Sequence, residues 1–293
     1  MEQITVNAYA KVNLGLDVIR KREDGYHEVK MIMQTVSLHD VLTVKRTNDS
    51  GITIRTNLDF LPVNRNNLIY QAAKRLMEHC KMREGISVDL KKHIPVAAGM
   101  AGGSADAAAV LHGINAMFEL GLNLKELQEI GVKIGADVPY CLMQGTALAE
   151  GIGEKLTELP AMPDCPVLIA KPPISVSTKF VYENLKLNAK MHHPDIDAQI
   201  QAIHRQDLKT IAECMGNVLE TVTIPNYPVI DQIKSCMTAN GAIRAMMSGS
   251  GPTVFGLFFD METAKDAEKA LRRSNLARQI CVTGMQRKPY GSV

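Results

Sequence analysis

The sequence contains no tryptophan, and no stretch of about 18 apolar residues occurs that could form a membrane-spanning helix. The first residues, Met-Glu-Gln-Ile-Thr-Val-Asn, lack the basic region and apolar core of a signal peptide. The net charge is only +2, and the short basic runs Lys91-Lys92-His93 and Arg272-Arg273 are interpreted as solvated faces. We therefore expect a cytoplasmic protein with no membrane or nucleic-acid partner.

The sequence has no Cys-x-x-Cys pair, and its six cysteines are widely scattered, at positions 80, 141, 165, 214, 236 and 281. This spacing favours reduced thiols over disulfides or a zinc site. The only adjacent histidines, His192 and His193, rarely converge on one metal and are expected in a surface loop. The cysteine and histidine pattern therefore indicates no metal centre.

A chain of 293 residues exceeds the size at which one core keeps growing, so two domains are expected. The proline-rich segment 160–166 is the predicted boundary, which divides the chain into residues 1–160 and 161–293. Periodicity predicts strands at 4–6, 12–19, 29–38, 41–44, 52–54, 86–90, 146–149, 167–170, 242–247, 253–259 and 279–282. It predicts helices near 68–80, 107–118, 124–134 (ending at Gly135), 177–185, 208–219, 229–237 and 262–272. The mixture indicates an α+β fold with a ferredoxin-like second domain.

The most informative segment is the glycine-rich loop at residues 95–105, which runs directly into an alanine-rich apolar stretch. Glycines allow a ligand to approach the backbone closely, and the free N–H groups of a first helical turn attract anions. We expect Ser104 or a neighbour to cap that helix. The loop matches neither the Walker pattern nor the dinucleotide pattern, so a plain linker stays the alternative to a phosphate site.

Three further features could carry chemistry, although each has an ordinary structural explanation. Lys11 lies on an otherwise apolar strand, and Asp137 follows a predicted helix end in Gly135-Ala-Asp-Val-Pro139. Ser248-Gly-Ser-Gly-Pro252 forms a second glycine turn. Phosphoryl transfer needs a phosphate cradle, a group that balances charge and a base near the attacking hydroxyl. The alternatives are an outward-facing lysine, a solvated loop acid and a simple strand connection.

Together, these motifs resemble the GHMP small-molecule kinases, in the order Ala10-Lys-Val-Asn13, the glycine loop, Gly135-Ala-Asp-Val-Pro139 and Gly249-Ser-Gly-Pro-Thr-Val-Phe255. The motif Asp24-Gly-Tyr-His27 narrows the resemblance to those GHMP kinases that act in the non-mevalonate isoprenoid pathway, on a substrate that carries a cytidine diphosphate group. The resemblance implies a two-domain fold. Its N-terminal ATP-binding domain is similar to domain 2 of ribosomal protein S5, its C-terminal domain is ferredoxin-like, and ATP and substrate lie between them.

The resemblance also implies roles for individual residues. Asp137 matches the catalytic aspartate and Lys11 its partner lysine. Asn13, Tyr26, His27 and Tyr182 match the substrate side, with Phe180 a less favoured second aromatic wall. The residues that match the ATP-binding loop are Pro95, Val96, Ala97, Ala98, Gly99, Met100, Ala101, Gly102, Gly103, Ser104 and Ala105.

One departure from the family pattern concerns the loop core, where many members have Gly-Leu-Gly and this chain has Gly99-Met100-Ala101. Methionine conserves the volume of leucine, so ATP binding is still expected. Mg²⁺ is expected as well, although the sequence assigns no ligands to it. A weak homodimer is a further option that the sequence does not decide. The alternatives are another GHMP kinase, acting on homoserine or a mevalonate derivative, and a non-catalytic nucleotide-sensing module.

Overall fold

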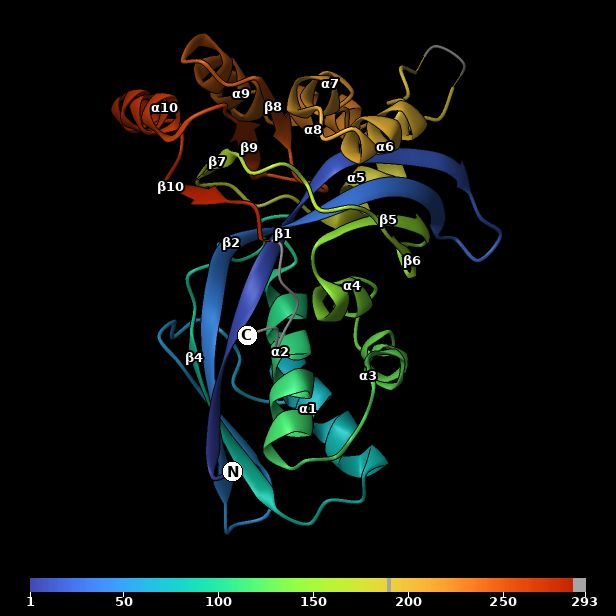
Figure 1. Cartoon of the computed structure of the whole chain (residues 1–293), viewed down its shortest axis with the longest axis vertical. Coiled ribbons are helices and arrows are strands. Elements are labelled where there is room, and N and C mark those ends of the chain that lie inside the picture. Colours follow the sequence, from blue (N-terminus) through green and yellow to red (C-terminus); the bar gives the residue numbers. More distant parts are fainter. Residues whose placement is uncertain (189–190, 287–293) are drawn as a thin grey trace.

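The structure, a computed structural model, describes residues 1–188 and 191–286. Figure 1 shows two α+β parts stacked along the long axis, the lower built on one sheet with α1–α4 and the upper on a second sheet with α5–α10. The mixed α+β class predicted from the sequence is confirmed.

The strands are β1 (Gln3–Lys21), β2 (His27–Thr47), β3 (Ile52–Thr56), β4 (Gly85–Lys91), β5 (Thr146–Gly151), β6 (Lys155–Glu158), β7 (Pro166–Lys171), β8 (Arg244–Met247), β9 (Val254–Leu257) and β10 (Gln279–Gly284). The helices are α1 (Leu68–His79), α2 (Gly102–Met117), α3 (Leu124–Gly131), α4 (Val138–Met143), α5 (Thr178–Asn184), α6 (Ile196–His204), α7 (Leu208–Glu213), α8 (Glu220–Asn226), α9 (Val229–Ala239) and α10 (Met261–Ser274).

The first sheet has the order β3-β4-β2-β5-β6, with β1 paired antiparallel to β2. The second sheet is antiparallel and has the order β10-β7-β9-β8. The chain passes from one sheet to the other between β6 and β7, through the proline-rich segment 160–166. The domain boundary at 160/161 stays a prediction, since a buried cluster unites Val12 and Leu14 of β1 with Ile169 of β7 and Phe255 of β9.

The long β1–β2 hairpin connects the two parts, because it starts at the lower end and bends beneath α6 (Figure 1). The sequence predicted four short strands in this region, which was wrong. Register shifts between Tyr9 and Lys11 and between Asn13 and Gly15 bend β1 without ending it. Asp40, which separates the predicted strands 29–38 and 41–44, lies inside β2, where its carboxylate is buried and paired with Lys92.

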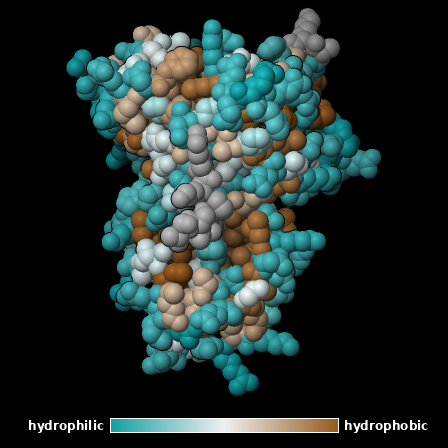
Figure 2. All heavy atoms as spheres, in the orientation of Figure 1, coloured by the Kyte–Doolittle hydropathy of each residue, from teal (hydrophilic) through white to brown (hydrophobic). Residues whose placement is uncertain are grey.

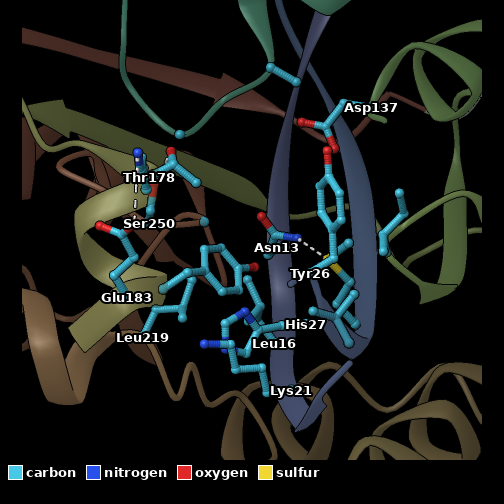
Figure 3. A pocket seen from close by; sticks show the side chains of 18 of the residues that line it. Asn13, Leu16, Lys21, Tyr26, His27, Asp137, Thr178, Glu183, Leu219 and Ser250 are labelled. Carbon is cyan, nitrogen blue, oxygen red and sulfur yellow. Dashed lines mark hydrogen bonds and ion pairs between the residues drawn. The ribbon is translucent and has the colours of Figure 1, made fainter. Parts of the chain in front are cut away.

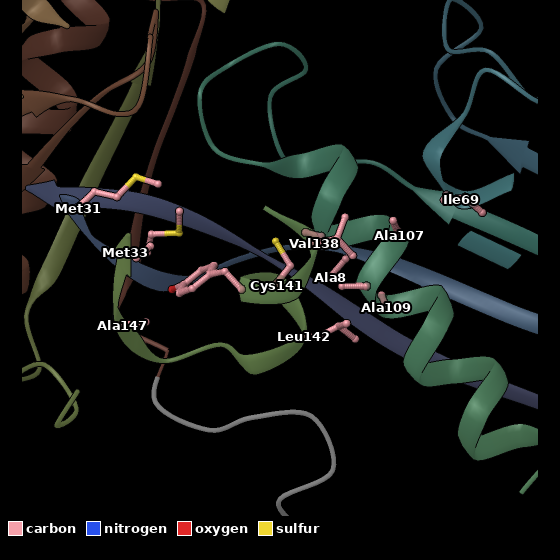
Figure 4. Close-up of a cluster of buried hydrophobic side chains, with 14 of the residues drawn as sticks. Ala8, Met31, Met33, Ile69, Ala107, Ala109, Val138, Cys141, Leu142 and Ala147 are labelled. Carbon is pink, nitrogen blue, oxygen red and sulfur yellow. The ribbon is translucent and has the colours of Figure 1, made fainter. Parts of the chain in front are cut away.

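The core of the lower part forms where α2 and α4 pack on the hairpin. Figure 4 shows Ala107 and Ala109 of α2 close to Val138 and Leu142 of α4. Because alanine is small, α2 lies deep, and its residues from Ala105 to Leu111 are all buried. This depth places the start of α2 beside the bend of β1.

Two predicted helices end earlier than expected. Helix α3 ends at Gly131 with Val132 as its C-terminal cap, so the predicted end at Gly135 was wrong. Helix α7 ends at Glu213, because the following segment pairs with β1. Leu16 donates its N–H to the Gly216 carbonyl at 2.9 Å and accepts that of Val218 at 3.0 Å. Helix α6 was not predicted.

Within the described residues, no helix combines the length and apolar character needed to cross a bilayer. Figure 2 shows a largely hydrophilic face, with hydrophobic atoms gathered at mid-height where the two parts meet. Two of the cavities described below are lined by residues of both parts.

Candidate active site

Lys11 is buried in the bent section of β1, with 5% of its surface exposed. The register shift after Tyr9 lets the Lys11 N–H leave the hairpin ladder and bond to the Met100 carbonyl at 3.2 Å. The strand is thereby tied to the glycine loop. The alternative of an outward-facing lysine is wrong, since its ammonium donates to Asn13 Oδ1 at 2.7 Å inside the protein.

Asp137 occupies the N-cap position of α4, but its carboxylate caps no backbone N–H. The chain reaches this position through a turn in which Val138 donates its N–H to the Gly135 carbonyl. Pro139 is the second residue of α4, and its restricted φ suits the first turn of a helix. The carboxylate is one-third exposed, and its Oδ2 lies 4.0 Å from Lys11 Nζ. A reactive carboxylate and a buried cation therefore face the same space.

That space is a cavity of about 740 Å³, which we call the acceptor cavity. Figure 3 shows Asn13, Tyr26 and Asp137 on one side and Thr178, Glu183 and Ser250 on the other. The predicted site residues Lys11, Asn13, Tyr26, His27, Asp137 and Tyr182 all line it. Ser250 of the second glycine turn lines it as well, together with residues that the sequence did not single out, including Leu16, Lys21, Thr178, Glu183 and Leu219.

An aromatic pair borders the acceptor cavity, formed by His27 of β2 and Tyr182 of α5. Their ring centroids lie 5.2 Å apart with an interplanar angle of 38°. Burial raises the pKa of Tyr182 to about 12. Burial, followed by the charge of Lys21, lowers the pKa of His27 below its usual value, so this ring is neutral at pH 7. Of the two aromatic candidates in α5, Tyr182 lines the cavity and Phe180 is not among its lining residues.

The glycine loop forms a second cavity of about 340 Å³, the loop cavity, with residues 61–62 and 66–68 on its opposite wall. Helix α2 begins at Gly102, and its N-cap is Ala101 in the left-handed region with φ 55°. Ser104 does not cap the helix, so that prediction was wrong. In the described structure, the first amide groups, those of Gly102 and Gly103, donate to no protein acceptor. These N–H groups and the helix dipole can hold an anion.

The second glycine turn packs directly against the loop. Ser248 Oγ donates to the Gly99 carbonyl at 2.9 Å, and a Cβ on Gly99 would clash with the Ser248 carbonyl oxygen. Asn217 Nδ2 supports the turn by donating to the Gly249 carbonyl at 2.8 Å. Sequence reasoning missed Asn217, because an isolated asparagine in an apolar segment carries no motif. The two turns therefore form one structural unit.

A buried charge cluster lies beneath the loop. Lys92 Nζ donates to Asp40 Oδ2 at 2.5 Å and to Asp106 Oδ2 at 2.6 Å. The interpretation of Lys92 as a solvated charge was wrong, because its side chain is buried and pairs with two buried carboxyl groups. Burial raises the pKa of Asp106 to about 8, against the lowering effect of Lys92. A Cβ on Gly102 would lie 3.1 Å from Lys92 Nζ, so the cluster directly supports the first turn of α2.

No group of three or more histidine, cysteine, aspartate or glutamate side chains with metal-binding geometry occurs among residues 1–188 and 191–286. Ser104 Oγ points toward the segment that precedes Asp137, since a Cβ on Gly135 would lie 3.8 Å from it. The loop thus presents a hydroxyl oxygen beside the carboxylate-bearing segment.

Comparisons with known proteins show the family of this chain. The GHMP kinases N terminal domain matches residues 67–145, and the GHMP kinases C terminal domain matches residues 199–277. A 4-diphosphocytidyl-2-C-methyl-D-erythritol kinase of Lachnospira eligens is 58% identical over 97% of this chain and 98% of its own length. A relative of the same name from Acetivibrio thermocellus is 47% identical over 94% of this chain and 96% of its own.

Among solved structures, a 4-(cytidine 5'-diphospho)-2C-methyl-D-erythritol kinase superposes with a TM-score of 0.84. It is 32% identical, and the match covers 97% of this chain and 100% of the other. Homoserine kinase from Cytophaga hutchinsonii superposes with a TM-score of 0.81 at 20% identity, over 98% of this chain and 95% of its own. At that identity, the homoserine kinase shows the shared fold alone.

Proposed function

The chain belongs to the GHMP kinase family, and we propose that it transfers the γ-phosphoryl group of ATP to 4-diphosphocytidyl-2-C-methyl-D-erythritol. The acceptor is the 2-hydroxyl group, and the reaction lies in the non-mevalonate route to isoprenoid precursors. The identity of 58% over nearly the whole chain supports this substrate. The observation that carries the proposal is the acceptor cavity, which has a carboxylate and a buried ammonium at one end and an aromatic pair along its wall.

Asp137 accepts the proton of the attacking hydroxyl. The hydroxyl oxygen forms a bond to the γ-phosphorus, the bond from that phosphorus to the β,γ-bridging oxygen breaks, and ADP leaves. Lys11 lies 4.0 Å from the carboxylate, so its ammonium can contact and steady the same hydroxyl group. Asn13 accepts from Lys11 at 2.7 Å and fixes the ammonium against this space.

The glycine loop holds the ATP phosphates. Gly102, Gly103 and Ser104 form the start of α2 and line the loop cavity, where the helix dipole favours negative charge. Mg²⁺ accompanies the nucleotide and neutralises phosphate charge when bound. Oxygen donors suit this ion, and the Ser104 hydroxyl is the loop oxygen that fits it.

The cytosine end of the substrate occupies the aromatic end of the acceptor cavity. A flat base can lie between Tyr26 and Tyr182, while His27 and its backbone supply hydrogen bonds to the base edge. A substrate without a base, such as homoserine or mevalonate, would leave this wall empty. The aromatic wall therefore argues against the two rival kinase activities.

We also propose a cytoplasmic location, which suits five cysteines that are free thiols, namely Cys80, Cys141, Cys214, Cys236 and Cys281. A homodimer stays a proposal that light scattering would test.

The function is tested by incubating the purified protein with ATP and Mg²⁺ and, separately, with diphosphocytidyl-methylerythritol, homoserine or mevalonate. We expect stoichiometric ADP release and a phosphorylated product with the first acceptor only. Preferred use of homoserine or mevalonate would move the chain to a different GHMP kinase activity. Failure to consume ATP with any acceptor would favour a nucleotide-sensing role.

A further inference from the structure

A third cavity, of about 500 Å³, borders the first residues of the glycine loop and is called here the Arg278 cavity. It is bordered by Phe60 in the segment after β3, by Val96 and Ala97 at the entry to the glycine loop, by Lys171 at the end of β7 and by Arg278 just before β10. Neither Lys11 nor Asp137 lines it, so the catalytic machinery does not account for it.

The charges around this cavity are of one sign. Four basic residues line it, namely Lys92, His93, Lys171 and Arg278, and no aspartate or glutamate is among its described lining residues. Lys92 already has two buried partners, Asp40 and Asp106, so its charge is not free for a ligand. Within the described chain, Lys171 and Arg278 pair with no carboxylate, so their charges are available to a ligand.

Lys171 and Arg278 are held close together by the sheet, because Arg278 donates its N–H to the Lys171 carbonyl at 2.9 Å. The Lys171 ammonium bonds to the Ile174 carbonyl at 3.1 Å, which fixes it at the cavity wall. Burial, and then the charge of Arg278, lowers the pKa of Lys171. The Lys171 ammonium is held at the cavity wall and the Arg278 side chain is exposed, so an anion between these two cations would relieve their repulsion.

An apolar surface lies beside these two cations. The Phe60 side chain is 71% exposed, and Val96 and Ile174 extend the apolar wall. We propose that the Arg278 cavity binds a small organic phosphate, with its phosphate group between Lys171 and Arg278 and its apolar or flat group against Phe60. Isolated cations would suit an inorganic anion equally well, whereas the exposed ring favours an ester that carries an apolar group.

An occupant of this cavity has a direct route to the nucleotide site. Val96 and Ala97 line both the Arg278 cavity and the loop cavity. A ligand that shifts or rigidifies this shared segment changes the affinity for ATP, and ATP then changes the affinity for that ligand by the same factor. The proposed site is thus a place where a phosphorylated metabolite could regulate the kinase.

The test is calorimetric titration of phenyl phosphate and of inorganic phosphate into the full chain, with and without a saturating non-hydrolysable ATP analogue and Mg²⁺. The analogue keeps the probes out of the glycine loop. The informative variants are Arg278→Gln and Phe60→Ser. The matched control is Arg273→Gln, which removes an exposed charge from α10 outside the cavity.

We expect phenyl phosphate to bind with the analogue present. Arg278→Gln should weaken binding at least about fivefold, and Arg273→Gln should change it less than about twofold. Phe60→Ser should weaken phenyl phosphate but not inorganic phosphate. Absence of binding with the loop occupied, or equal binding to Arg278→Gln and wild type, would overturn the proposal. If the analogue itself does not bind, the comparison of Arg278→Gln with Arg273→Gln in the free protein still decides the outcome.

Discussion

The ammonium of Lys11 lies 4.0 Å from the Asp137 carboxylate, farther than the 2.7 Å that separates it from Asn13 Oδ1. Asn13 therefore sets the position of the ammonium, and the carboxylate keeps its acceptor oxygens for another donor. Catalytic hydrogen bonds are often long before substrate binds and tighten in the complex. The gap between Lys11 and Asp137 fits a hydroxyl group that both residues contact.

The first prediction concerns this carboxylate. Asp137→Asn keeps the shape of the side chain and removes the proton acceptor, so kcat should fall by roughly 10² to 10⁴. The affinity for ATP, measured by calorimetry, should change less than about twofold. Glu183→Gln is the matched control, because it removes a carboxylate that also lines the acceptor cavity. A kcat for Asp137→Asn equal to that of the control would reject the assignment.

The second prediction concerns the contact between the two glycine turns. Gly99 and Gly121 both have positive φ, at 71° and 72°, but a Cβ meets the Ser248 carbonyl oxygen only at Gly99. The variants Gly99→Ala and Gly121→Ala therefore share the conformational strain, and only the first adds a steric clash. We expect Gly99→Ala to lose about 1–3 kcal/mol more stability than Gly121→Ala and to raise the KM for ATP. Urea unfolding and initial-rate kinetics would measure both effects, and equal behaviour would show that the contact is unimportant.

The third prediction concerns the Lys92 charge cluster. The pKa of Asp106 is raised to about 8 from its usual value of 3.8. Between these two pH values, Asp106 is protonated in the folded protein and ionised in the unfolded chain. Stability from this group is therefore present at low pH and is lost as pH rises toward 8, with a slope of at most about 1.4 kcal/mol per pH unit.

Urea unfolding at about pH 5.5 and about pH 7.5 provides the measurement. Wild type should lose stability over this interval relative to Asp106→Asn, in which the titrating group is absent. Asp266→Asn, which changes an exposed carboxylate of α10, should follow wild type. Parallel pH profiles for wild type and Asp106→Asn would show that Asp106 ionises normally.

The sequence drew attention to Lys11 and Asp137, which the structure places at one cavity, but not to the contacts that support them. Local motifs marked Lys11 and Asp137, because a charged residue in an apolar strand or after a helix end is visible in one dimension. The supporting contacts link distant segments. Gly99 meets Ser248 across 149 residues, and Lys92 meets Asp40 across 52. No periodicity records such pairs.

The errors in secondary structure have the same origin. The predicted strands 29–38 and 41–44 leave out Asp40, although this residue lies inside β2. A buried carboxylate is unfavourable unless it is paired, and the partner of Asp40 is Lys92, which is distant in the sequence. The predicted helix 208–219 ends early because the backbone around Gly216 pairs with β1. In both places, a tertiary contact outweighs the local preference.

The last prediction concerns the choice of base. Stacking on Tyr26 and Tyr182 is worth about 1–3 kcal/mol per base in nucleic-acid binders, and it tolerates any base. Cytosine differs from uracil in its amino group and its unprotonated ring nitrogen, so discrimination needs hydrogen bonds to that edge. His27 is placed to supply them, because it lines the acceptor cavity beside Tyr182 and its lowered pKa keeps the ring neutral, with one donor and one acceptor nitrogen. A site built for those bonds rejects the opposite donor pattern, since buried polar groups would stay unpaired.

We expect the cytidine diphosphate substrate to have a kcat/KM far above that of its uridine analogue. His27→Ala should narrow this preference, whereas Tyr26→Ala should lower kcat/KM for both substrates by a similar factor, and Tyr26→Phe should retain most of the activity because the ring remains. Equal use of the two nucleotides by the wild-type enzyme would remove the basis for a cytosine pocket at His27.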